Sequence, residues 1–306
     1  MTVPSSPASM TARFFLVSYL PTCAALLFLL VLGWAAYGPG TSFRRAWRVA
    51  TALSPTQVVL LVLLATVVAV LLMPFQLWFV RLLEGTWPGW LGGTLSVERQ
   101  KARRSELARA AVPASDAPEV LRAAGLAGLR LRQRYPGAEH LVRASRLGNI
   151  LAATEDRAGR DYGIDAVVAW PRLYPLLGGQ LRTVVDDRRN NLDSMARFTV
   201  TAVVTAVAAL VVLRDAGAWA ALAAAPLVVA VLAYHACLHA AVAYGESVQV
   251  AFDLSHLTFG ATFGLARPGD LSGERVQYRH LCDLWRQSIP TPFPYAAPAP
   301  SEGGAT

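Results

Sequence analysis

Four apolar segments, arranged two and two around a polar middle, dominate the hydrophobic pattern of this chain. Their approximate ranges are Phe14 to Tyr37, Val58 to Val80, Phe198 to Leu213 and Trp219 to Tyr244. Each approaches or exceeds the roughly 20 apolar residues that an α-helix needs to cross the hydrocarbon of a bilayer, and the third is the shortest. The pattern predicts an all-α integral membrane protein with four transmembrane helices, in a 2+2 arrangement, and a helical cytosolic insertion.

This pattern divides the chain into six parts. They are a short cytosolic N-terminus (1–13), transmembrane helices 1 and 2 (14–80), a helical cytosolic domain (81–197), transmembrane helices 3 and 4 (198–244), a cytosolic helical extension (245–288) and a disordered tail (289–306). The tail is rich in Pro, Ala and Gly and cannot bury a core.

Helix-start and helix-stop residues indicate helices throughout the polar middle, where no segment alternates with a period of two. The expected helices run from about Ser96 to Ala111, from near Pro118 to Pro136, from Ala138 to Ala158, and from Ile164 to Leu177. A longer helix, from Gly179 to Leu213, begins in the cytosol and ends across the membrane.

Composition supports the membrane class. Hydrophobic residues make up 54% of the chain and charged residues 16%, with a mean hydropathy of +0.39, values typical of multi-pass proteins. The first apolar segment is too long for the core of a signal peptide and lacks a clear cleavage site, so we interpret it as a retained anchor.

Basic residues favour a cytosolic location for both termini and the polar middle, in a protein of the cell inner (plasma) membrane. Four spans place these parts on one side, together with most of the arginines near span ends. The opposite side of the membrane also carries basic residues, so the difference between the two sides is smaller than this count suggests. They are Arg44, Arg45 and Arg48 between spans one and two, and Arg214 in the turn between spans three and four. The segment from Thr41 to Leu53 is predicted to be an amphipathic helix on the outer surface.

The net charge of +8 does not indicate a nucleic-acid partner, because the arginines are scattered among acidic neighbours. Anionic lipid headgroups of the bilayer explain the charge more simply. The three cysteines form no disulfide framework.

A ladder of alternating charges precedes the third span, with neighbouring members three or four residues apart. Its members are Arg182, Asp186, Arg189, Asp193 and Arg197. This spacing places opposite charges side by side on one helix face. Two interpretations remain open: a solvated face with weak ion pairs, or a packed interface within one chain or between subunits.

A polar stripe begins within the fourth span and leaves the bilayer on one face of its helix. Its members are His235, His239, Glu246, Gln249, Asp253 and His256. Three interpretations compete: the wet face of an emerging helix, a polar lining or ion path in a helical bundle, and a metal site at His235 and His239. A bare HxxxH pair is a weak metal motif, so no metal ligand set is assigned.

Motifs for catalysis and cofactor binding are not found. The chain has no P-loop, no GxGxxG after a strand and no GxSxG elbow. We therefore expect no cofactor and no enzymatic activity.

The run Arg81-Leu82-Leu83-Glu84-Gly85-Thr86-Trp87-Pro88, directly after the second span, resembles a feature of uncharacterised actinobacterial multi-pass membrane proteins. So do Arg146-Leu147-Gly148-Asn149, Tyr162-Gly163-Ile164-Asp165 and Trp170-Pro171-Arg172-Leu173. The resemblance implies no activity. Physically, Arg81 and Trp87 are interfacial anchors, and Glu84 is a juxtamembrane carboxylate placed to pair with Arg81 or Arg197.

These observations favour a non-enzymatic membrane scaffold or sensor that meets a cytosolic partner or a second copy through its cytosolic helices. The alternative is an oligomeric ion channel or transporter that uses the polar stripe.

Overall fold

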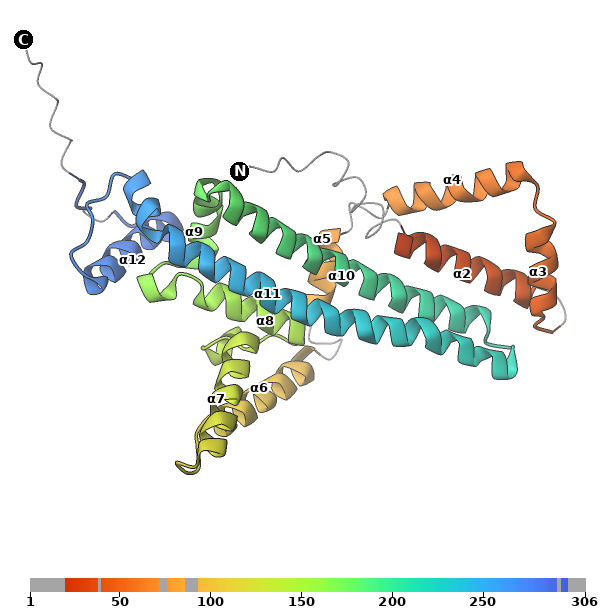
Figure 1. Ribbon diagram of the computed structural model, residues 1–306, viewed down its shortest axis with the longest axis horizontal. Coiled ribbons are helices and arrows are strands. Elements are labelled where there is room, and N and C mark those ends of the chain that lie inside the picture. The colour runs from red at the N-terminus through yellow and green to blue at the C-terminus, as the bar shows by residue number, and fades with distance from the viewer. Residues whose placement is uncertain (1–19, 38–39, 72–75, 86–92, 291–292, 297–306) are drawn as a thin grey trace, which may run out of the picture. The chain divides into compact units, whose positions relative to one another are not determined.

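Figure 1 shows a computed structural model of the chain, which describes residues 20–37, 40–71, 76–85, 93–290 and 293–296. Helices supply nearly all the regular structure in these ranges. The one pairing of extended segments there is an isolated antiparallel bridge between Leu265 and Tyr295. The prediction of an all-α fold is therefore confirmed for the described part of the chain.

The chain divides into two compact units, each made from two stretches of sequence. The first unit comprises residues 1–83 and 190–240, and the second unit comprises residues 84–189 and 241–306. Two long helices, α10 (Gly179–Val212) and α11 (Ala224–Thr262), contribute to both units. The predicted helix from Gly179 to Leu213 is confirmed to within one residue.

The other helices belong mainly to one unit each. Those of the first unit are α2 (Leu20–Ala36), α3 (Phe43–Thr51), α4 (Pro55–Leu71) and the 3₁₀ helix η7 (Gly217–Ala223), with α5 (Gln76–Glu84) ending at the boundary. Those of the second unit are α6 (Gly93–Ala110), α7 (Pro118–Arg134), η4 (Glu139–Leu141), α8 (Arg146–Arg157), η5 (Arg160–Tyr162), α9 (Ala166–Leu173), η6 (Tyr174–Leu176) and α12 (Leu271–Gln287).

Two helical segments are long and apolar enough to cross a membrane: α10, and the run Gly217–Thr262 in which η7 leads into α11. The pair α3 and α4, bent by 108°, adds a third if it forms one broken span. The described parts of α2 and α4 have 17 residues each, and the predicted first two spans extend into residues 14–19 and 72–75, outside the described ranges. Among the described residues the structure therefore shows two candidate spans, not four.

The core of the second unit is aromatic and draws on α9, α10, α11 and α12. Phe252 and Phe259 of α11 are fully buried. The ring of Phe259 lies 5.7 Å from that of Trp285, and the ring of Phe252 lies 5.9 Å from that of Trp170. Aromatic pairs of this kind add about 0.5–1.5 kcal/mol beyond the area they bury. The second half of α11 is therefore held by the core of the second unit.

The predicted helix from Ala138 to Ala158 is wrong in its first half. Residues Glu139–Leu141 form the 3₁₀ turn η4, and α8 begins only at Arg146. Its start is set by Ser145, whose hydroxyl accepts the N–H of Gly148 at 2.8 Å, a standard N-cap.

Asn149 explains why the segment before α8 is not helical. Its side chain is fully buried, and its carbonyl oxygen accepts the N–H of Arg143 at 2.8 Å. Its amide nitrogen donates to the carbonyl oxygens of Arg143 and Ser145 at 2.9 and 2.7 Å. A side chain that bonds the backbone in this way competes with the helical hydrogen bonds. Residues 142–145 therefore leave the helix that their periodicity predicts.

Gly148 allows α8 to approach the end of α5. A Cβ atom at Gly148 would overlap the carbonyl oxygen of Glu84. On the opposite side of the contact, Gly85 has a φ of 77°, and a Cβ there would lie 2.7 Å from the backbone nitrogen of Ser145. Two of the runs that carry the family resemblance, 81–85 and 146–149, thus meet where only glycine fits.

Part of the tail differs from the expected disorder. The N–H of Ala266 donates to the carbonyl of Pro294 at 2.7 Å, and the N–H of Ala296 donates to the carbonyl of Gly264 at 2.9 Å. Phe293 packs against the aromatic core. Residues 293–296 therefore belong to the folded second unit.

Replacing Gly148 by Ala should destabilise the second unit, because the new methyl group and the Glu84 carbonyl cannot both keep their positions. We expect a loss of about 1–3 kcal/mol, the usual cost of overpacking, in urea unfolding of the purified protein in detergent. Gly125 of α7 is the matched control, since nothing lies within 4 Å of the Cβ it would gain. Gly125→Ala should be neutral or stabilise by up to about 1 kcal/mol, and equal losses for both variants would contradict the contact.

Candidate functional site

The polar stripe is divided between the two units. His235 and His239 belong to the first unit, and both side chains are exposed. The members in the second unit are Glu246, Gln249, Asp253 and His256. No group of three His, Cys, Asp or Glu side chains in the described ranges is arranged to hold a metal ion.

His256, at the end of the stripe, is a packed side chain. Its Nδ1 lies 2.5 Å from a carboxylate oxygen of Glu274 on α12, and the two side chains are only 16% and 8% exposed. Its ring stacks on that of Tyr162 with centroids 3.8 Å apart. The hydroxyl of Tyr278 donates to the carbonyl oxygen of His256. The wet-face interpretation is therefore wrong for this residue, which joins α11 to α12.

Tyr162, which stacks on His256, has its hydroxyl beside the carboxylate of Asp253. Burial raises the pKa of its hydroxyl, and the negative charge of the neighbouring Asp253 raises it further. Tyr162 therefore remains a neutral hydroxyl at physiological pH.

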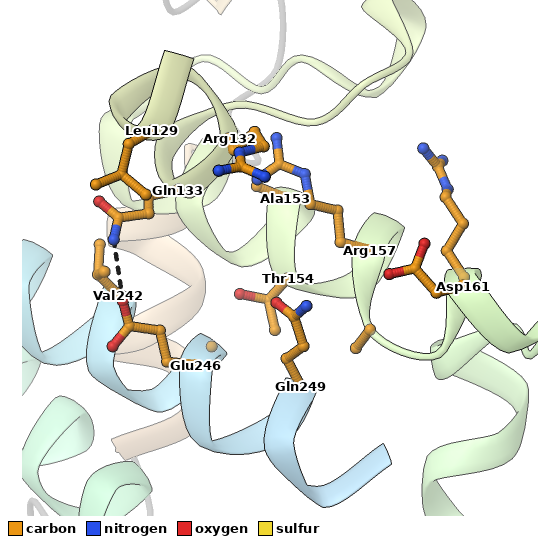
Figure 2. Close-up of a pocket in the computed structure, with 13 residues that line it drawn as sticks. Leu129, Arg132, Gln133, Ala153, Thr154, Arg157, Asp161, Val242, Glu246 and Gln249 are labelled. Atoms are coloured by element: carbon orange, nitrogen blue, oxygen red, sulfur yellow. Dashed lines mark hydrogen bonds between the residues drawn. The ribbon is translucent and has the colours of Figure 1, made fainter. Parts of the chain in front are cut away.

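Glu246 and Gln249 line a cavity of about 480 Å³ in the second unit, shown in Figure 2. Its walls come from α7, α8, η5 and α11. The polar lining residues are Arg132 and Gln133 of α7, Thr154 and Arg157 of α8, Arg160 and Asp161 of η5, and Glu246 and Gln249 of α11. Figure 2 shows Gln249 pointing from α11 toward Thr154.

The floor of the cavity is a close contact between α8 and α11. A Cβ atom at Gly245 would overlap the hydroxyl of Thr154, so these two helices touch at this point. The Thr154 hydroxyl donates to the carbonyl of Ile150 at 3.1 Å. Its oxygen can still accept a hydrogen bond.

Arg157 fixes one wall of the cavity. Its Nη2 donates to the carbonyl of Tyr135 at 2.8 Å and reaches that of Leu131 at 3.5 Å, at the C-terminal end of α7, where a cation is favoured. Burial above all, and to a smaller extent the positive charges of Arg132 and Arg160, lowers the pKa of Arg157 to about 10 against the opposing effect of Asp156. The guanidinium remains protonated at neutral pH.

The remaining charges of the cavity are partly paired. Arg160 forms an ion pair with Asp156, and one carboxylate oxygen of Glu246 accepts the amide of Gln133 at 3.0 Å. Arg132 and Arg157 have no carboxylate within ion-pair distance among the described residues. One wall of the cavity thus carries two arginines that form no ion pair with a carboxylate of the described ranges.

The charge ladder also spans both units, with Arg182, Asp186 and Arg189 in the second unit and Asp193 and Arg197 in the first. Asp186 accepts the hydroxyl of Tyr174 at 2.5 Å, and the guanidinium of Arg182 lies 4.7 Å from the centre of the same ring. This end of the ladder therefore contacts Tyr174 of η6.

Arg197 lies at the opposite end of the ladder and is only 3% exposed. Its Nη2 donates to the carbonyl of Ala69 at 3.3 Å, while its Nη1 has no hydrogen-bond partner among the described residues. It thus contacts α4 within the first unit.

Among the juxtamembrane residues, Glu84 has a partner that was not predicted. It pairs with Arg143 at 3.7 Å, because the Gly148 contact brings the end of α5 beside the segment before α8. Trp87 lies outside the described residues.

Arg132, Thr154 and Arg157 were not predicted as site residues. Arg157 lies three residues after Thr154, which gives the two a common helix face, but this signal is not distinguishable from ordinary surface polarity. Only the fold brings them beside α7 and α11.

Comparisons with protein-family models, with curated proteins and with solved structures find no match to this chain. Its function must therefore be inferred from its own residues.

Proposed function

We propose that this chain is a multi-pass inner-membrane protein that acts as a non-enzymatic scaffold or sensor through its cytosolic helices. One observation carries the proposal: α10 and α11 supply both the segments able to cross a membrane and part of the core of the second unit. Val185 of α10 and Phe252 of α11 are buried in that core. The second unit is thus built on the continuations of two membrane helices.

Exposed apolar side chains support a topology of four spans. Leu60 and Leu64 of α4 are 58% and 59% exposed, and Val204 and Leu210 of α10 are 59% and 54% exposed. Apolar surface of this density is unfavourable in water and favourable in lipid. In the proposed topology both termini and the second unit lie in the cytosol, and the resemblance to actinobacterial multi-pass proteins agrees with it.

Cysteine labelling tests this topology. In a chain with Cys23, Cys237 and Cys282 replaced by Ser, an impermeant maleimide added to intact cells should label Ala52→Cys and Asp215→Cys but not Ala114→Cys. All three positions are exposed on the protein. The Ala114→Cys variant should react after the cells are permeabilised. Labelling of this variant in intact cells would overturn the cytosolic placement of the second unit.

Photo-crosslinking tests the scaffold or sensor function. Leu121, Leu126 and Leu129 of α7 are 45%, 51% and 41% exposed. A photoreactive amino acid is placed at each of these positions in turn, and at least one variant should capture a second copy or a cytosolic partner in living cells. The same amino acid at Ala52 is the control and should give no such product. Failure to capture any protein at these three leucines, at normal expression, would contradict the proposal.

A second candidate is an oligomeric channel or transporter that uses the polar stripe. The exposed His235 and His239 favour it, since ionisable groups at membrane depth usually face a cavity or a partner. In this case the purified protein should conduct ions in planar bilayers, and Glu246→Gln should change its ion preference. If the purified protein conducts no ions, the channel candidate is excluded and the scaffold or sensor function remains.

A further inference from the structure

The cavity of the second unit has two arginines on one wall, Arg132 and Arg157, that form no ion pair among the described residues. Arg132 has no hydrogen-bond partner among the described residues, and Arg157 uses only its Nη2. The positive charge of Arg132 adds to the larger effect of burial in lowering the pKa of Arg157, so the two guanidinium groups repel each other. An anion between them would remove this repulsion and accept their free N–H groups.

Arg157 is preorganised for such a ligand. Its two contacts with the end of α7 fix the plane of the guanidinium while leaving Nε and Nη1 free. These free atoms are not enclosed by protein, since Arg197 Nη1 is the one buried side-chain atom without a partner in the described ranges. A guanidinium held in place loses little entropy when it binds a phosphate or carboxylate.

The rest of the cavity offers acceptors for hydroxyl groups. The second carboxylate oxygen of Glu246, the oxygen of Thr154 and the carboxylate of Asp161 can each accept a hydrogen bond. The amide of Gln249 has no partner among the described residues and can donate or accept. A ligand with negative charge at both ends would be repelled by the carboxylates of Glu246 and Asp161. The part of the ligand that faces these carboxylates therefore needs hydrogen-bond donors.

We propose that this cavity binds a small hydroxylated molecule that carries one phosphate group, with the phosphate at Arg132 and Arg157 and the hydroxyls toward Thr154, Glu246 and Gln249. The cavity volume of about 480 Å³ lies within the range of roughly 300–1,000 Å³ that is usual for small-molecule sites. The phosphate belongs either to a soluble metabolite or to a lipid headgroup. The inference rests on the proposed function, for which it supplies the chemical class of the sensed ligand.

Isothermal titration calorimetry of the purified full chain in detergent tests this proposal. Glycerol 3-phosphate is the soluble probe, dihexanoyl phosphatidylglycerol is the lipid probe, and glycerol is the control without phosphate. Arg132→Gln is the main variant, because this exposed side chain holds no other part of the fold. Arg130→Gln is the matched control, since Arg130 is exposed on the same helix but does not line the cavity.

We expect saturable binding of one probe, weakened about tenfold or more by Arg132→Gln, as for loss of a charge-assisted hydrogen bond, and unchanged by Arg130→Gln. Thr154→Val should weaken binding less, because it removes one neutral acceptor. Tighter binding of glycerol 3-phosphate assigns the site to a soluble molecule, and tighter binding of the lipid assigns it to a headgroup.

Binding of neither probe, binding of glycerol alone, or equal effects of the two arginine variants would overturn the proposal. The measurement needs neither the membrane orientation nor a protein partner. Its failure would therefore leave the scaffold or sensor function standing, while failure of the crosslinking experiment would leave this site intact.

Discussion

The close approach of α8 to its neighbours is the constraint on which the second unit depends. Residues Leu147 to Ala153 are all buried, and small residues at the contacts let backbone meet backbone. Gly148 meets the end of α5, Thr154 meets Gly245 of α11, and Arg157 meets the end of α7. Close packing of this kind is sensitive to a single added methyl group. Within the second unit, α8 therefore packs directly against residues of three other helices.

The cavity follows from the same arrangement. The cavity lies beside the second half of α8, where Thr154 touches α11 and Arg157 bonds the end of α7, and polar side chains line it. Arg157 has two roles there, since it completes the end of α7 and supplies charge to the cavity. The site is thus built on helices rather than loops, which holds its side chains more accurately.

The sequence predicts long elements well and close contacts poorly. The start of α7 at Pro118 and the length of α10 follow from local rules of capping and hydrophobic period. The start of α8 does not, because the Asn149 side chain, which reads as an ordinary polar residue, bonds the backbone four and six residues upstream.

The polar stripe shows the same limit in the candidate site. Helical periodicity places its members on one face, but it does not tell what lies opposite that face. His256 meets a buried glutamate and a tyrosine ring, and Glu246 meets a glutamine 113 positions away in the chain. These partners are set by the tertiary structure and cannot be predicted from composition or residue spacing.

Gly245 links the shape of the cavity to the packing of the helices around it. It lines the cavity, and it is also where α11 touches Thr154 of α8. Any side chain at this position would reduce the space for a ligand and at the same time push two helices apart. Ligand preference and fold stability are therefore not independent traits in this protein. A substitution at an exposed lining residue, such as Arg132 or Gln249, can change the cavity without acting on this helix contact.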